Sequence, residues 1–247
     1  MKNIFLLLML SIVLFSCKKP PKAGQVSLKI EHLVGTESFD FDTMKYVSPT
    51  NHPYKITKLF YYVSEITYIM TDGTEEVQVG GFLINPDEES TLKITNSDLR
   101  PGTYNKVRFQ FGIDSTNNVT DYLAQSLENI SMEWPDQLGP GDYHYMKFEG
   151  KYDSLSTGIE KSFIYHYGPT IGNDNSFSVE LAVGEFVIDD NSFNVIVNAD
   201  IQEWFQNPTL YNFPDYSMVM MNQSFQEIYK ANGQSVFSFR QLTEDAQ

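Results

Sequence analysis

Apolar and polar residues alternate along most of this chain, and a period of two is typical of β-strands that bury one face. Near the start, Val26, Leu28 and Ile30 fall on one face of a strand, while Ser27 and Lys29 fall on the other. The same pattern recurs in residues 54–70, 77–84, 107–113, 144–148, 163–166, 177–183, 193–201 and 236–239. So many short strands, separated by turn residues, predict a fold built from packed β-sheets.

One late segment, residues 217–233, has helical spacing instead. Its apolar stripe, which we interpret as core packing, consists of Met218, Met221, Phe225 and Ile228. The Asn232-Gly233 pair is a typical helix end. The sequence therefore predicts an all-β fold, an antiparallel β-sandwich or Greek key with a short C-terminal helix, as one domain over residues 25–247.

The first residues have the features of a targeting segment. Residues 1–16 hold a short apolar run from Ile4 to Phe15, after which the small residue Ser16 precedes Cys17. This is the processing pattern of a bacterial lipoprotein signal peptide. Residues 17–24 then form an acylated cysteine and a polar tether, in which lysines rather than acidic residues follow Cys17. We therefore expect a lipid-anchored protein of the bacterial cell envelope that faces the periplasm, although an ordinary secretory signal stays an alternative.

Composition excludes several partners and sites. The chain has 17 basic and 32 acidic residues, a net charge of −15, which disfavours nucleic acid and leaves the lipid anchor as the expected contact with a membrane. Cys17 is the single cysteine, so the mature chain has no internal disulfide and no thiolate metal site. The metalloprotease motif HExxH and the hydrolase motif GxSxG are both absent from the sequence.

Three of the four histidines fall on apolar strand faces when residues are assigned to alternate faces along each strand, which we call the parity argument. They are His32, His144 and His166, whereas His52 lies in a turn. A buried imidazole needs partners for both ring nitrogens, which either hydrogen bonds within the core or a metal ion could satisfy. Because the chain offers imidazoles and no thiolate, copper is the metal that we favour.

The order of motifs resembles the MbnP-like family. They are "VSLKIEHLVG", "YKITKLFYYVSEITY", "RPGTYNKVRFQFGID", "MEWP" followed by "YHYMKFEGKY", "FIYHYG", "MNQSFQEIYKANG" and "VFSF", spread over residues 26–239. Members of this family are periplasmic or secreted copper-binding proteins, some of them encoded near methanobactin genes. The resemblance implies a β-sandwich with a Cu(I) site formed by histidines and by a tryptophan that a partner di-haem enzyme of the MauG kind oxidises to kynurenine.

Carried over by motif, the resemblance implies that His32, His166 and Trp134 form the metal site, with His144 as a further candidate ligand. We expect His32 and His166 to pair across the sandwich. One departure from the family pattern is Asp136, at a position where a second tryptophan is common.

These observations predict a non-catalytic protein that holds Cu(I) for copper acquisition or handling. The alternative is a metal-free β-sandwich lipoprotein that binds a protein partner or a glycan. Exposed aromatic residues such as Tyr61, Tyr145 and Tyr211 would serve that alternative function.

Overall fold

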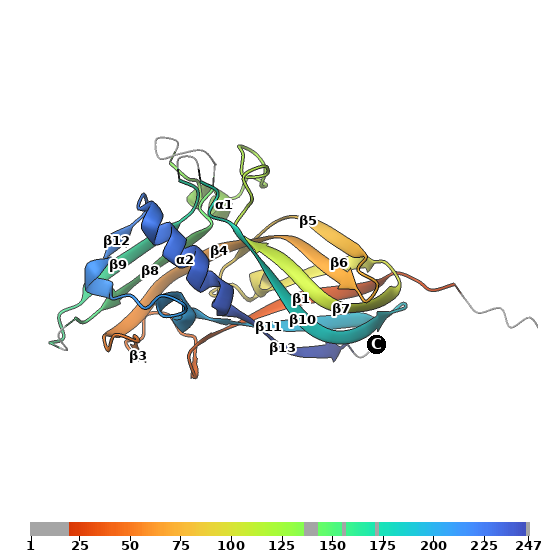
Figure 1. Ribbon diagram of the computed structural model, residues 1–247, viewed down its shortest axis with the longest axis horizontal. Coiled ribbons are helices and arrows are strands. Elements are labelled where there is room, and N and C mark those ends of the chain that lie inside the picture. The colour runs from red at the N-terminus through yellow and green to blue at the C-terminus, as the bar shows by residue number, and fades with distance from the viewer. Residues whose placement is uncertain (1–19, 136–142, 155–156, 171–172, 246–247) are drawn as a thin grey trace, which may run out of the picture.

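Two β-sheets make up most of the protein in a computed structural model that describes residues 20–135, 143–154, 157–170 and 173–245 (Figure 1). The five-stranded sheet has the order β13 (Phe237–Glu244), β11 (Ser192–Asp200), β1 (Gly24–Val34) and β2 (Glu37–Ser38), with β6 (Lys93–Leu99) also paired to β1. The eight-stranded sheet has the order β10 (Phe177–Ile188), β7 (Gly102–Phe111), β4 (Pro53–Met70), β8 (Met146–Tyr152), β9 (Lys161–Tyr167) and β12 (Met218–Val219), and β3 (Tyr46–Val47) and β5 (Glu75–Ile84) both pair with β4.

The predicted all-β sandwich with a C-terminal helix is confirmed, but its sheets are not purely antiparallel. Strand β1 runs parallel to β11, and β12 runs parallel to β9. The short helical elements are α1 (Leu127–Ser131), η1 (Glu89–Leu92), η3 (Ile201–Phe205) and η4 (Phe213–Asp215). No helix in the described part of the chain is long and apolar enough to cross a membrane.

Aromatic rings fill the space between the sheets. Phe237 of the five-stranded sheet contacts Phe109 and Phe111 of β7, with ring centroids 5.2 Å and 5.9 Å apart, and Tyr61 of β4 stacks on Phe111 at 5.4 Å. These residues are at most 5% exposed. The burial of such large rings is the main apolar contribution to the stability of the sandwich.

The C-terminal helix takes the place of a second sheet over strands β8 and β9. Helix α2 (Gln223–Val236) lies along that end of the eight-stranded sheet, and its C-terminal end leads directly into β13 of the five-stranded sheet (Figure 1). Its Tyr229 packs on Tyr165 of β9 and on Trp204 of η3, with ring centroids 5.7 Å and 5.1 Å apart. The inner face of β9 is therefore covered by α2, and only its outer face is free to carry a site.

The predicted bounds of this helix were wrong at both ends. The Asn222 side chain accepts a hydrogen bond from the backbone N–H of Phe225, which caps the helix at its true start, six residues later than expected. Met218 instead lies in β12 and is 73% exposed, and Met221 is 42% exposed, so the interpretation of these two residues as core packing was wrong. It is confirmed for the other two members of the stripe, because Phe225 is 2% exposed and Ile228 packs against the core. At the other end, the helix continues past Gly233 to Val236, and glycine stands at this position because an added Cβ would come within 2.2 Å of the Phe177 ring.

The predicted targeting segment falls almost wholly outside the described residues. Residues 1–19, including Cys17, are not described, and the chain is described from Pro20 onward, with β1 beginning at Gly24. The signal peptide, the acylation of Cys17 and the envelope location stay predictions from the sequence.

Candidate metal centre

Strand β9 places His166 on the outer face of the eight-stranded sheet. Its neighbours Tyr165 and Tyr167 are at most 1% exposed and point into the core, so alternation turns His166 to the opposite side. Across the antiparallel ladder, His166 stands opposite Lys147 of β8. The prediction that His166 lies on an inward face was therefore wrong, because the aromatic residues of "FIYHYG" occupy that face.

His144 lies beside His166, although it comes before the start of β8. The two imidazole rings are perpendicular, with centroids 4.9 Å apart. Tyr145 and Met146 are both fully buried, so the strand alternation breaks between His144 and Met146. This break carries His144 away from the core face that the parity argument assigned to it, and His144 is nevertheless only 2% exposed.

One nitrogen of His144 is held by the backbone, and the other is free to act as a ligand. The ring Nδ1 lies 3.0 Å from the carbonyl oxygen of Met132, to which it donates as Nδ1–H. That tautomer leaves the lone pair on Nε2, which is buried and has no hydrogen-bond partner among the described residues. Burial, with a smaller contribution from Lys147, lowers the His144 pKa to about 3, so the ring is neutral near pH 7.

Trp134 forms the third side of this cluster. Its indole ring is 4.6 Å from the His144 ring, centroid to centroid, and is 2% exposed. Like Nε2 of His144, its Nε1 is buried without a hydrogen-bond partner in the described part of the chain. The indole lies directly on Gly168, where an added Cβ would come within 2.6 Å of the Trp134 Cζ3 atom. Glycine follows "FIYHY" because this position has to admit the indole.

Glu149 orients the second imidazole, and sequence reasoning missed it. Its Oε1 lies 3.2 Å from Nε2 of His166 and 3.3 Å from Nζ of Lys58. The hydrogen bond from His166, with a smaller effect of Lys58, lowers the Glu149 pKa to about 2. In the tautomer whose Nε2–H donates to this carboxylate, Nδ1 of His166 carries the lone pair. The spacing of Lys147 and Glu149 in "MKFEG" could have signalled a polar outer face opposite the strand of His166.

His32 lies elsewhere, so the expected pair of His32 and His166 was wrong. The His32 Nε2 is 2.8 Å from the hydroxyl of Tyr61, whose ring stacks on Phe111 in the core between the sheets. His166 is on the far side of the eight-stranded sheet from that core. The structure thus brings together His144, His166 and Trp134 and separates them from His32.

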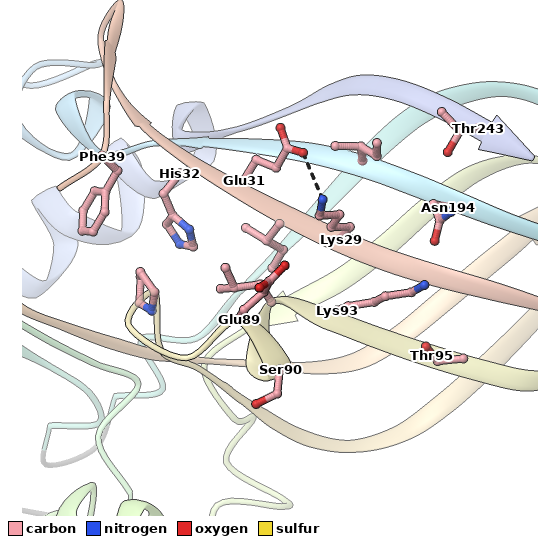
Figure 2. Close-up of a pocket in the computed structure, with 14 residues that line it drawn as sticks. Lys29, Glu31, His32, Phe39, Glu89, Ser90, Lys93, Thr95, Asn194 and Thr243 are labelled. Carbon is pink, nitrogen blue, oxygen red and sulfur yellow. Dashed lines mark ion pairs between the residues drawn. The ribbon is translucent and has the colours of Figure 1, made fainter. Parts of the chain in front are cut away.

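The surroundings of His32 form an open groove of about 990 Å³. Figure 2 shows the His32 ring beside Phe39, with charged side chains further along the groove, among them the ion pair of Lys29 and Glu31 at 3.4 Å. Phe39 is the one aromatic ring apart from His32 among the lining residues of this groove. The tyrosines that were expected to be exposed, Tyr61, Tyr145 and Tyr211, are buried at 2%, 0% and 5% exposure, so this expectation was wrong.

The donors present suit an ion with few ligands. Within the described residues, no group of three or more His, Cys, Asp or Glu side chains is arranged to hold a metal ion. A zinc site usually needs four protein or water donors, whereas two imidazoles, one of them packed against an indole, are a competent set for Cu(I). The unpartnered Nε2 of His144 is the feature of this chain that fits such an ion.

The fold and the cluster together define an all-β protein with a candidate metal centre on the outer face of one sheet. The sequence model of the MbnP family matches residues 23–221, and the chain therefore belongs to this family. This confirms the resemblance, although the match ends before α2 and the motifs extend to Phe239. Among solved structures, MbnP from Methylosinus trichosporium is similar, with a TM-score of 0.52 and 10% identity over 91% of this chain and 100% of that chain, which is a similarity of fold. No curated protein matches the sequence.

Proposed function

We propose that this protein binds Cu(I) between His144 and His166 and holds it for copper handling at the bacterial cell envelope, without turnover. The observation that carries the proposal is the buried Nε2 of His144, which is neutral and unpartnered and lies beside a second imidazole. Membership of the MbnP family supports the choice of copper.

The chain's own residues prepare the two ligands. The Met132 carbonyl fixes the ring of His144, and Glu149 fixes that of His166, so each imidazole has a defined tautomer before a metal arrives. Trp134 covers the His144 ring and keeps water away from it. Cu(I) would be the cargo of this site.

Competition for Cu(I) against a chromophoric chelator tests the proposal. We expect the purified protein to withdraw Cu(I) from the chelator, and we expect a His144→Ala/His166→Ala variant to lose this ability while it stays folded by circular dichroism. His32→Ala is the matched control, because His32 is on the other side of the sheet and should leave Cu(I) binding intact. Equal competition by the wild type and the double variant would overturn the assignment.

We also propose, on the resemblance to the family, that Trp134 is oxidised to kynurenine by a partner di-haem enzyme of the MauG kind. The contact of Trp134 with His144 puts the product beside the proposed ligands. Mass spectrometry of the Trp134 peptide from the native host tests this. An unmodified mass in copper-replete cells that express the partner would count against it.

The alternative function, binding of a protein partner or a glycan without metal, has less support. The tyrosines that it would use are buried, and the groove near His32 holds a single aromatic ring besides the imidazole. A glycan site usually needs exposed aromatic surface on which sugar rings can lie.

A further inference from the structure

Three methionines stand at the edge of the sheet next to the proposed copper ligands. Met218, Met220 and Met221 fall within four consecutive residues, and Met218 and Met221 are 73% and 42% exposed. An exposed, long apolar side chain contributes little to folding, so packing does not account for Met218 and Met221, while Met220 is half-buried between them.

The register of β12 places Met218, and by its continuation Met220, on the same face as His166, and Met221 follows directly after them. Met218 pairs with Ile164 and Val219 with Tyr165 in the parallel ladder between β12 and β9. Val219 and Tyr165 are both buried, at 4% and 0% exposure, so Met218 and Ile164 face outward with His166.

A buried glutamine joins the next residue of this edge to His166 itself. The Nε2 of Gln226 donates to the carbonyl oxygen of His166 at 3.1 Å and to that of Met220 at 2.8 Å. The backbones of Met220 and His166 are therefore neighbours, as the continuation of the register past Val219 requires. Gln226 is fully buried, so this link is a fixed part of the fold.

We propose that Met218, Met220 and Met221 form a thioether docking site that takes up Cu(I) first and passes it to the imidazoles of His144 and His166. Thioether sulfur is a soft donor that prefers Cu(I) to the common divalent ions, and methionine side chains are flexible enough to follow a moving ion. The proposal rests on the proposed function for the transfer step, whereas binding at the methionines stands on its own.

The first test isolates the methionines from the histidines. Ag(I), which resembles Cu(I) in charge and softness, is titrated into the His144→Ala/His166→Ala variant labelled with ¹³C at the methionine methyl groups. We expect the methyl signals of Met218, Met220 and Met221 to shift and saturate, and that of Met44, a partly buried methionine in the turn before β3, to stay in place. A titration in which no signal of the three methionines moves, or in which Met44 moves equally, would overturn the proposal.

The second test measures uptake by the intact site. Cu(I) transfer from a coloured chelator complex is followed by stopped flow for the wild type, for Met218→Leu/Met220→Leu/Met221→Leu, and for Met44→Leu. Leucine preserves the apolar volume and removes the sulfur, so we expect several-fold slower uptake by the triple variant and the wild-type rate for Met44→Leu. Equal rates in the triple variant and the wild type would refute a docking site. If the wild type itself takes up no Cu(I), the proposed function fails, and the Ag(I) titration still decides whether the methionines bind.

Discussion

Replacing Gly168 by alanine should damage both the stability of the protein and its proposed metal centre. An added Cβ at this position would lie 2.6 Å, 2.8 Å and 3.2 Å from three atoms of the six-membered ring of the Trp134 indole. The indole is 2% exposed and wedged against His144, so it cannot swing aside as a flexible chain end would. Overpacking of this kind costs about 1–3 kcal/mol.

For a glycine without close neighbours, Gly→Ala is expected to change the stability in the opposite direction, so the sign of the change tests the reasoning. Gly→Ala stabilises a protein by about 0.4–1 kcal/mol where the backbone tolerates it, because the unfolded chain loses entropy. Gly102→Ala is the matched control, since its nearest neighbour, at 2.7 Å, is the terminal methyl carbon of the flexible Met70 side chain. Urea denaturation should therefore show a clear loss for Gly168→Ala and a small change for Gly102→Ala.

A double mutant tests the cause of the loss. Trp134→Phe removes the ring atoms that the new Cβ would strike, so Gly168→Ala should cost less in that background, and the two changes should not be additive. We also expect Gly168→Ala alone to weaken Cu(I) binding, because a displaced indole disturbs His144. The reasoning is refuted if Gly168→Ala is as stable as the wild type, or if its cost is the same with phenylalanine at position 134.

Three further predictions follow from single side chains. Burial lowers the pKa of His32 to about 4 from its usual 6.5, so its neutral form contributes stability that is fully present above pH 6.5 and is lost as pH falls toward 4. At about 1.4 kcal/mol per pKa unit, the wild type should lose up to about 3 kcal/mol of unfolding free energy across that range. His32→Gln should lose less when urea unfolding is measured at each pH, and an unchanged slope would contradict this. Glu149→Gln should weaken Cu(I) binding about 10–100-fold in chelator competition, as loss of a partner of a ligating histidine does elsewhere, and wild-type affinity would exclude its role. Gln226→Leu should cost about 1–3 kcal/mol in urea denaturation, because buried backbone groups lose their hydrogen bonds, and a cost near zero would show that water replaces the amide.

Strand content and fold class were predictable because they depend on a repeating pattern. The alternation in residues 54–70 predicted a strand, and β4 spans Pro53–Met70 with a register shift between Ser64 and Ile66. Glu65, at φ 50°, adopts the left-handed backbone of that irregularity. Whether a segment forms a strand depends on residues that are close together in the chain, so it can be read from the sequence.

The geometry of the metal centre was not predictable in the same way. Parity assigned His144 and His166 to inward faces, but the break in alternation at Tyr145 and the aromatic inner face of β9 turn both outward. Parity also put His32 on an inward face, without revealing that the eight-stranded sheet lies between it and His166. Which residues meet depends on how distant strands are arranged, and the sequence pattern of one strand does not contain that information.

X-ray absorption at the copper edge of the Cu(I)-loaded protein tests the central claim most directly. Multiple scattering from imidazole rings counts the histidines bound to the metal, in the wild type and in His144→Ala and His32→Ala variants. The account predicts two imidazole ligands in the wild type, fewer in His144→Ala and an unchanged spectrum in His32→Ala. A spectrum that changes in His32→Ala, or that stays the same in His144→Ala, would contradict the assignment of copper to the outer face of the sheet.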